Sequence, residues 1–391
     1  MGNEKFDFFV SVPPGFENLV LRELQKFYSN YSDSFYMAPP EDWSLHKGGV
    51  ELNCSVEAGC LLNYELKTAN RVLMRIYKGP CKTLNDLQDA LTKSKLLEII
   101  GSSGFEASVS YRSSKLNHEK KIKSAVSQWR KKALGKESLE KENLQRIDIR
   151  IFRDEVTISL DASGERLHKR GWRKKSPKAP IRENLASGML MTLFSYIHND
   201  DGKNVQLIDP MMGSGTLLKE ASDYFQPNLQ REYSFERWPN IPNLKKSLKA
   251  NSNEFKVDEF FGSEIDKSTF GLLEKNGIPN RSEKSHWRLF QGDFRDMPFE
   301  INDSHRLLIC NLPYGDRVKR KGGVAPEKLL EILIKKYQPT RMGLLAKIDN
   351  RNRVDHNLPE NWQILHTIYF ENGGIPVVYK VYGQNHSFLD L

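Results

Sequence analysis

Hydrophobic positions in the first 165 residues alternate between strand-like and helix-like spacing. Residues 6–12, FDFFVSV, combine aromatic and β-branched side chains and predict a strand that ends at a Pro-Pro-Gly turn. Residues 16–28 repeat apolar side chains at helical spacing and predict an amphipathic helix. The same criteria predict strands at 50–54, 105–114, 147–154 and 155–163, and helices at 61–79 (leading into a strand), 84–100 and 119–135. This mixture predicts an α+β region.

The pattern changes near residue 179, where strands and helices begin to alternate. Such alternation predicts a parallel sheet with crossover helices. Strands are predicted at 204–210, 259–265, 286–293, 306–311 and 341–349, helices at 215–225, 268–277 and 326–337, and a terminal hairpin at 362–383. A doubly wound, Rossmann-like sheet that ends in an antiparallel hairpin resembles the class I methyltransferases.

A short basic segment, residues 166–178, separates the two patterns. It holds seven Lys and Arg residues and no acid, and Gly171 and Pro177 interrupt regular structure there. We therefore expect an exposed arm or linker. The chain then divides into an α+β region at 1–165, a basic linker at 166–178 and an α/β domain at 179–391.

The composition is that of a folded, moderately basic protein. Its 391 residues include 59 Lys and Arg against 50 Asp and Glu, a net charge of +9 that favours a polyanionic partner. No apolar run reaches the roughly 18 residues of a membrane span, and no signal pattern opens the chain, so a cytoplasmic protein is expected. The four cysteines form no C-x-x-C pair and the nine histidines show no metal spacing, so we expect free thiols and no metal.

The strongest local signal is DPMMGSGT, residues 209–216, between a predicted strand and a predicted helix. Gly213 and Gly215 permit a tight turn and let backbone N–H groups approach a ligand at the helix N-terminus. The segment does not match the dinucleotide-binding motif G-x-G-x-x-G, because Leu218 stands at the position of the third glycine. It does not match a phosphate-binding loop either, because no Gly-Lys-Ser/Thr follows. A nucleotide-like cofactor at the end of the first strand is therefore favoured over a plain turn.

Two acids follow later strands. Glu264, with Asp266 as second candidate, ends a strand where a carboxylate accepts hydrogen bonds from ribose hydroxyls. Glu264 comes 49 residues after Gly215 rather than the usual ~20, so residues 224–259 are interpreted as an insertion. Asp293 ends the next strand and is a candidate acceptor for an adenine amino group. The alternative for each is a solvated turn acid.

The tetrapeptide Asn311-Leu312-Pro313-Tyr314 directly follows the strand RLLIC. An exocyclic amine on a base is a poor nucleophile, because its lone pair is delocalised into the ring. If the Asn311 side-chain oxygen and the Leu312 carbonyl accept its N–H groups, the lone pair can face an electrophile, while Tyr314 stacks on a flipped-out base. The electrophile would be the methyl group of S-adenosylmethionine (SAM), and catalysis would depend on positioning. A β-turn without chemistry is the alternative.

Cys310 is a weaker candidate. Pyrimidine C5 methylation uses a cysteine nucleophile, but no base is evident beside Cys310, and a small residue in a buried strand accounts for it.

Over nearly its whole length the chain resembles the THUMP-domain RNA methyltransferases, in particular the bacterial RlmL type. The matching segments are FDFFVSVPPGFENLVLREL, GGVEL, EKKIKSAVSQW, the region 155–190, DPMMGSGTLLKEA, SFERWP, GSEID, QGDFRDM and NLPYGDR. The resemblance implies a ferredoxin-like and THUMP RNA-binding region before the methyltransferase domain, and methylation of guanine N2 in 23S ribosomal RNA. It also implies that the catalytic residues are Asn311, Leu312, Pro313 and Tyr314.

The resemblance and the motifs together predict the SAM site. Its residues would be Pro180, Ile181, Arg182, Glu183, Asp209, Pro210, Met211, Gly213, Gly215, Thr216, Glu264, Ile265, Asp293, Phe294 and Asn311. This chain departs from the family at Met212, commonly Cys, and at Leu312, which replaces the first proline of N-P-P-Y. Some members are fused to a second methyltransferase; this chain ends after one, so one activity is expected.

Three groups of basic residues are candidates for contact with RNA phosphates. They are Lys120, Lys121, Lys123, Arg130, Lys131 and Lys132 on a predicted helix; Arg166, Lys169, Arg170, Arg173, Lys174 and Lys175, with Trp172, in the arm; and Arg317, Lys319, Arg320 and Lys321 after the catalytic loop. Charge that serves solubility alone is the alternative for each group.

These observations predict a SAM-dependent RNA guanine-N2 methyltransferase acting on 23S ribosomal RNA. A tRNA guanine-N2 enzyme, an adenine-N6 methyltransferase and a non-catalytic RNA-binding ribosome-assembly factor remain as alternatives.

Overall fold

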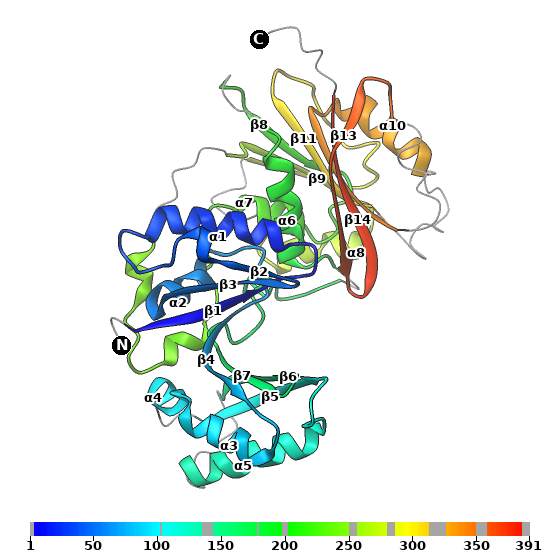
Figure 1. Ribbon diagram of the computed structural model, residues 1–391. Helices are drawn as coiled ribbons and strands as arrows, with labels where there is room; N and C mark the ends of the chain where they lie inside the picture. Colours follow the sequence, from blue (N-terminus) through cyan, green and yellow to red (C-terminus); the bar gives the residue numbers. More distant parts are fainter. Residues whose placement is uncertain are drawn as a thin grey trace. The chain divides into compact units, whose positions relative to one another are not determined.

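The computed structural model contains two compact units, each built around a seven-stranded sheet (Figure 1). It describes residues 4–101, 104–134, 144–177, 180–197, 202–249, 256–279, 286–312, 326–348 and 358–384. The first unit comprises Met1–Val12, Val20–Leu167 and Pro227–Ala250, and the second comprises Pro13–Leu19, His168–Gln226 and Asn251–Leu391.

The sheet of the first unit is antiparallel except at one edge. Its strands are β1 (Lys5–Ser11), β2 (Ser44–His46), β3 (Gly49–Ser55), β4 (Arg71–Pro80), β5 (Phe105–Arg112), β6 (Gln145–Phe152) and β7 (Glu155–Asp161). They run in the order β2-β3-β1-β4-β7-β6-β5, and only β5 and β6 pair in parallel. A two-residue turn joins β6 to β7, with positive φ at Arg153 and Asp154, as tight hairpin turns require.

Helices of the first unit follow the predicted pattern with one break. They are α1 (Glu17–Tyr31), α2 (Val56–Glu65), α3 (Leu84–Lys93), α4 (Leu96–Ile100) and α5 (Glu119–Leu134). The prediction of one helix over 84–100 was wrong. Ser94 adopts extended backbone and its hydroxyl donates to the Leu91 carbonyl at 2.8 Å, so α3 ends there.

Residues 227–249, here called the return segment, complete the first unit although they follow residues of the second. Tyr64 donates to Glu236 at 2.6 Å, and its ring meets those of Tyr233 and Phe235 edge-to-face. The indole of Trp238 donates to the Gln145 side-chain oxygen at 2.9 Å. This excursion accounts for the long spacing between the glycine turn and Glu264.

The sheet of the second unit is parallel up to a terminal hairpin. Its strands are β8 (Val205–Asp209), β9 (Glu259–Glu264), β10 (Trp287–Gln291), β11 (His305–Asn311), β12 (Arg341–Lys347), β13 (Trp362–Asn372) and β14 (Ile375–Gln384). They run in the order β10-β9-β8-β11-β12-β14-β13, with β14 antiparallel to both β12 and β13. Asn372-Gly373-Gly374 turns the predicted hairpin.

The helices of the second unit are α6 (Glu183–Phe194), α7 (Thr216–Ser222), α8 (Lys267–Phe270), α9 (Leu272–Lys275) and α10 (Pro326–Tyr337). The pattern did not predict α6, because it is buried on nearly every side and so lacks a polar stripe. The single helix predicted at 268–277 forms two short helices that meet at Gly271.

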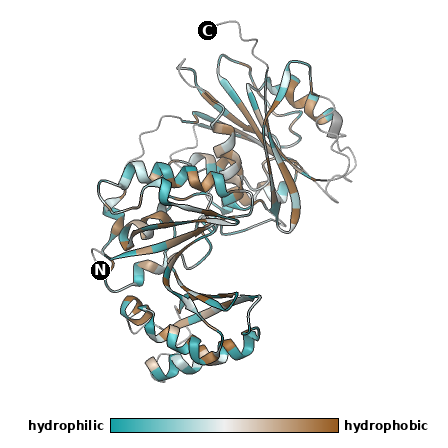
Figure 2. Ribbon diagram, viewed as in Figure 1, coloured by the Kyte–Doolittle hydropathy of each residue, from teal (hydrophilic) through white to brown (hydrophobic). Residues whose placement is uncertain are grey.

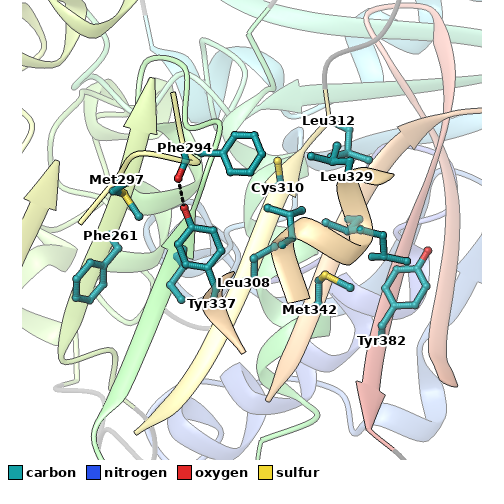
Figure 3. Packing of buried hydrophobic residues seen from close by; sticks show 14 of the residues in the cluster. Phe261, Phe294, Met297, Leu308, Cys310, Leu312, Leu329, Tyr337, Met342 and Tyr382 are labelled. Atoms are coloured by element: carbon teal, nitrogen blue, oxygen red, sulfur yellow. Dashed lines mark hydrogen bonds between the residues drawn. The ribbon is translucent and has the colours of Figure 1, made fainter. Parts of the chain in front are cut away.

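Side chains pack on both faces of the second sheet. On one face, Leu308 and Cys310 of β11 belong with Leu330 of α10 to a buried cluster (Figure 3). On the other face, the Tyr379 hydroxyl of β14 donates to the Met189 carbonyl of α6 at 2.9 Å. Figure 2 shows the corresponding brown colour along these strands, whereas α5 of the first unit is largely teal.

The two units confirm the predicted fold class, an α+β N-terminal region followed by a Rossmann-like domain with a C-terminal hairpin. Among the described residues, no helix has the length and apolar character needed to cross a bilayer.

If the return segment stabilises the first unit, Trp238→Ala will lower its stability. Trp238 is 3% exposed, and truncating a buried aromatic costs about 3–5 kcal/mol. Denaturant unfolding of the full chain, followed by a probe in the first unit, measures the loss. Leu229→Ala is the matched control, since Leu229 lies in the same segment but is 46% exposed. Equal effects of the two substitutions would contradict the role of the segment.

Candidate functional site

The candidate site lies at the carboxyl edge of the second sheet, where neighbouring parallel strands end. Asp209 ends β8, and Asn311 ends β11, which pairs with β8 in parallel. Ligands of doubly wound sheets bind at this edge. The sheet thus brings together the glycine turn and the start of the predicted catalytic loop, as the sequence predicted.

The glycine turn adopts a backbone that requires its glycines. Gly213 and Gly215 have φ of +57° and +78°, and Gly215 is the N-cap of α7. A Cβ on Gly215 would lie 2.7 Å from Leu273 Cδ2, so a side chain would clash as well as strain the backbone.

Met212 anchors the turn to the next strand. Its N–H donates to the Ser263 carbonyl at 2.9 Å, and the Ser263 hydroxyl donates to the Pro210 carbonyl at 2.6 Å. A Cβ on Gly262 would lie 2.4 Å from the Met212 sulfur. The methionine at this position therefore fits because its neighbour on β9 has no side chain. Ser263 was not predicted; its place just before Glu264 is the only signal for it in the sequence.

Asp209 is a buried acid with no cation beside it in the described part of the chain. It is 1% exposed, and its carboxylate accepts one backbone N–H, from Met211, at 3.2 Å. Burial raises the pKa of Asp209 to about 8, the Met211 N–H opposes the rise, and the Glu264 carboxylate adds to it. Such an acid is suited to a ligand that carries positive charge.

Asn311 presents an acceptor that no described residue uses. Its side-chain oxygen Oδ1 is buried and has no hydrogen-bond partner among the described residues. An unsatisfied buried carbonyl is costly and rare in native proteins. Leu312 is buried and its N–H donates to the Leu345 carbonyl of β12 at 3.0 Å, which fixes the strand end. Pro313 and Tyr314 lie outside the described residues.

The acids predicted at later strand ends occupy the same edge. Glu264 ends β9 and its side chain accepts the Asp266 N–H at 2.7 Å. Asp266 itself accepts the Thr269 N–H as the N-cap of α8, which gives it a structural role. Two hydrogen bonds from the Arg295 side chain, at 2.6 and 2.9 Å, hold the pKa of Asp293 below its usual value.

The two apolar residues predicted beside these acids differ in exposure. Ile265 is 61% exposed. Phe294 is 7% exposed and lies in the cluster against α10, where its carbonyl accepts the Tyr337 hydroxyl at 2.9 Å (Figure 3).

Two residues of the basic arm are buried, so their prediction as exposed RNA contacts was wrong. Arg170 is 4% exposed and pairs with Glu220 of α7 at 3.1 Å, and Ser187 of α6 also donates to that carboxylate. Trp172 is 6% exposed. Arg170 is held by a partner 50 residues away in the sequence, which a local charge pattern does not reveal.

Arg173 also turns inward, whereas its two lysine neighbours do not. The Arg173 side chain pairs at 2.7 Å with Glu183, the first residue of α6, which was predicted at the cofactor site with Pro180, Ile181 and Arg182. Lys174 and Lys175 are exposed, and their backbone N–H groups donate to the side chain of Asn276, each at 2.9 Å.

The basic residues of α5 stay available at the surface. Lys120, Lys121, Lys131 and Lys132 are exposed; Lys123 forms an exposed pair with Glu119 at 2.7 Å. Arg130 is partly buried and donates to the Phe105 carbonyl. Arg166 and Lys169 are exposed. Arg317, Lys319, Arg320 and Lys321 lie outside the described residues.

Cys310 is not suited to nucleophilic attack. It is fully buried, and burial raises the pKa of its thiol well above the ordinary value, as does the nearby Asp209 carboxylate. All four cysteines are buried and free. Within the described ranges, no group of three or more His, Cys, Asp or Glu residues could hold a metal ion.

Comparison with known proteins places this site in a recognised domain family. Residues 170–350 match the family described as RMKL-like, methyltransferase domain. The chain is 28% identical over 340 residues to the ribosomal RNA large subunit methyltransferase K/L of Shewanella pealeana, covering 80% of this chain and 44% of the relative. The Marinomonas protein of the same name is 34% identical over 195 residues, 46% of this chain. The chain thus spans less than half the length of these relatives.

Solved structures share the fold over the whole described architecture. A possible methylase from Clostridium difficile 630 has a TM-score of 0.76 at 23% identity, with 99% of this chain and 100% of that chain covered. SMU.472, solved in complex with SAH, has a TM-score of 0.75 at 21% identity, with 98% and 100% covered. TrmN from Thermus thermophilus has a TM-score of 0.67 at 16% identity.

The matched residues contain the glycine turn, Asp209, Glu264, Asp293 and Asn311, which are the features that the sheet edge brings together. Residues 170–350 of the chain are thus similar to the RMKL-like methyltransferase domain family.

Proposed function

We propose that this protein is a SAM-dependent RNA methyltransferase of the cytoplasm that methylates guanine N2 in 23S ribosomal RNA. The observation that carries the proposal is the unpartnered Asn311 Oδ1 at the end of β11, next to the strand that ends in the buried Asp209. The names of the relatives, ribosomal RNA large subunit methyltransferases, support RNA as the substrate.

The residues at the sheet edge fit SAM, which carries a sulfonium and an ammonium group. Asp209 is a buried carboxyl without a cation, and Glu264 adds negative charge nearby. Gly213 and Gly215 keep the turn free of side chains in front of α7. Glu264 and Asp293 are our candidates for the ribose hydroxyls and the adenine amine. When bound, SAM supplies an electrophilic methyl group.

Asn311 would orient the attacking nitrogen. Its Oδ1 can accept one N–H of an exocyclic amine. That N–H is the hydrogen-bond donor that no described residue supplies. The Leu312 carbonyl is our candidate for the second N–H, and Tyr314 for stacking on the base. No side-chain base is needed before methyl transfer, because the amine loses its proton afterwards. The catalytic contribution is positioning and preorganised dipoles.

The first unit is our candidate for binding RNA, with α5 as its basic element. Lys120, Lys121, Lys131 and Lys132 are exposed there, where phosphate contacts are available. In the segment that follows, exposed Arg166, Lys169, Lys174 and Lys175 retain this role, whereas the buried Arg170 and Trp172 lose it. Arg317 and Lys319 stay in the proposal from sequence alone.

The direct test incubates the purified protein with methyl-labelled SAM and with ribosomal RNA or tRNA from a strain that lacks the gene. Nucleoside mass spectrometry then identifies the product. N2-methylguanosine in 23S ribosomal RNA supports the proposal. The same nucleoside in tRNA identifies tRNA as the substrate, and N6-methyladenosine identifies adenine as the methylated base. No methylation despite SAM binding supports a non-catalytic assembly factor.

Asn311→Ala will lower the rate of methyl transfer by a factor of about 100–1,000, the usual effect of removing one preorganised transition-state contact. Because the deleted oxygen has no hydrogen-bond partner among the described residues, the free energy of unfolding will fall by no more than about 1 kcal/mol. Single-turnover kinetics at saturating SAM and thermal unfolding measure the two effects. A variant that is unstable, or that is stable and fully active, would contradict the role assigned to Asn311.

Replacing Lys120, Lys121 and Lys131 by Gln will weaken RNA binding and flatten its dependence on salt. Each lost phosphate contact reduces the slope of log K against log salt by about one. Lys47→Gln is the control, since Lys47 is exposed in the same unit but lies away from α5 in the chain. If the triple variant keeps the wild-type slope, α5 does not bind RNA.

A further inference from the structure

Arg173 is the one side chain of the basic arm whose guanidinium reaches the glycine turn in the described structure. It donates from Nη1 to the Ser214 hydroxyl at 3.1 Å and from Nη2 to the Thr216 hydroxyl at 2.7 Å. These two residues flank Gly215, which holds a left-handed backbone conformation at the start of α7. Both are 3% exposed, so water does not readily replace the arginine as their partner.

The guanidinium is itself fixed from two further sides. Its Nε donates to Glu183 at 2.7 Å, and its Cζ lies 4.5 Å from the centre of the Trp172 ring. The Glu183 side chain is 6% exposed, which makes this a largely desolvated ion pair. The planar guanidinium of Arg173 thus bonds to three acceptors: Glu183 of α6, and Ser214 and Thr216 at the glycine turn. The single ammonium group of lysine does not reproduce this geometry.

The chain before and after Arg173 is also immobilised. Arg170 pairs with Glu220 of α7, and the backbone of Lys174 and Lys175 is held by the Asn276 side chain. Both ends of this stretch are therefore tied to the methyltransferase unit. Because its own segment holds Arg173 in place, the hydrogen bonds from Arg173 to Ser214 and Thr216 restrain the glycine turn.

We infer that Arg173 is a positioning residue, which fixes the glycine turn in its SAM-binding conformation by joining Ser214 and Thr216 to the start of α6. The inference rests on the proposed function, because it assigns the turn to SAM. It removes Arg173 from the RNA-binding residues and gives the basic segment a second use: its exposed lysines face solvent while Arg173 shapes the cofactor site.

A double-mutant cycle of SAM affinity tests this role. Arg173→Lys, Thr216→Val and the double variant are titrated with SAM, and kcat is measured at saturating SAM. Each single variant is expected to bind SAM roughly tenfold more weakly, since a charge-assisted hydrogen bond is lost, and Arg173→Lys is expected to keep kcat nearly unchanged. The double variant is expected to bind SAM no more weakly than the single variant with the lower affinity, because both changes remove the same Arg173–Thr216 hydrogen bond.

The controls separate this role from general destabilisation. Arg75→Lys alters a comparable arginine–carboxylate pair, with Glu51 in the first unit, and should leave SAM affinity unchanged. Ser214→Ala, which keeps the Arg173–Glu183 pair, covers the case in which Arg173→Lys does not fold. Strictly additive effects of Arg173→Lys and Thr216→Val, or wild-type affinity in folded Arg173→Lys and Ser214→Ala, would overturn the inference. Failure of the wild-type protein to bind SAM would instead overturn the proposed function.

Discussion

The central constraint on the methyltransferase unit is an acid buried at the carboxyl end of β8. Asp209 is 1% exposed and receives one N–H donor from the turn that follows it. Leaving an ionised carboxylate in such a place is unfavourable, so the free protein keeps it protonated up to about pH 8. A cation that binds beside it removes this penalty. Among the described residues, the site therefore lacks a positive charge beside Asp209, and a sulfonium or ammonium ligand supplies it.

The features around Asp209 each preserve the backbone that such a ligand needs. Gly215 turns the chain into α7, Gly262 leaves room for Met212, and Ser263 ties the turn to β9. Asn311 presents an unused oxygen on the neighbouring strand. In the proposed function, adjacent strand ends meet the cofactor and the base, and the proposed methyl transfer requires no further acid or base from the protein.

Much of the site could be predicted from the sequence because it depends on local signals. Asp209 and Asn311 each stand where a predicted strand ends, and Gly215 stands where the next predicted helix begins. Parallel strands bring their carboxyl ends to one edge of the sheet. The fold class followed from the change of periodicity near residue 179. Helix α6 was missed for the opposite reason, since its residues are apolar almost all round and carry no period.

The remaining errors concern residues whose partners are distant in sequence. Arg170 and Trp172 belong to a segment that is basic by composition, yet Glu220 lies 50 residues from Arg170. The interpretation of residues 224–259 as an insertion did not say where that segment packs, because its contact with Tyr64 through Glu236 joins residues 172 positions apart. Burial and long-range pairing decide these positions, and neither is visible in a local pattern.

Calorimetric titration with SAM in buffers of different ionisation enthalpy tests the central claim most directly, because it counts protons released on binding. The raised pKa of Asp209, about 8, means that the free protein binds a proton at pH 7 that a cationic ligand displaces. The account predicts release of close to one proton at pH 7, affinity that rises with pH until about 8, and loss of both effects in Asp209→Asn. Binding without proton release, or the same release in Asp209→Asn, would contradict it.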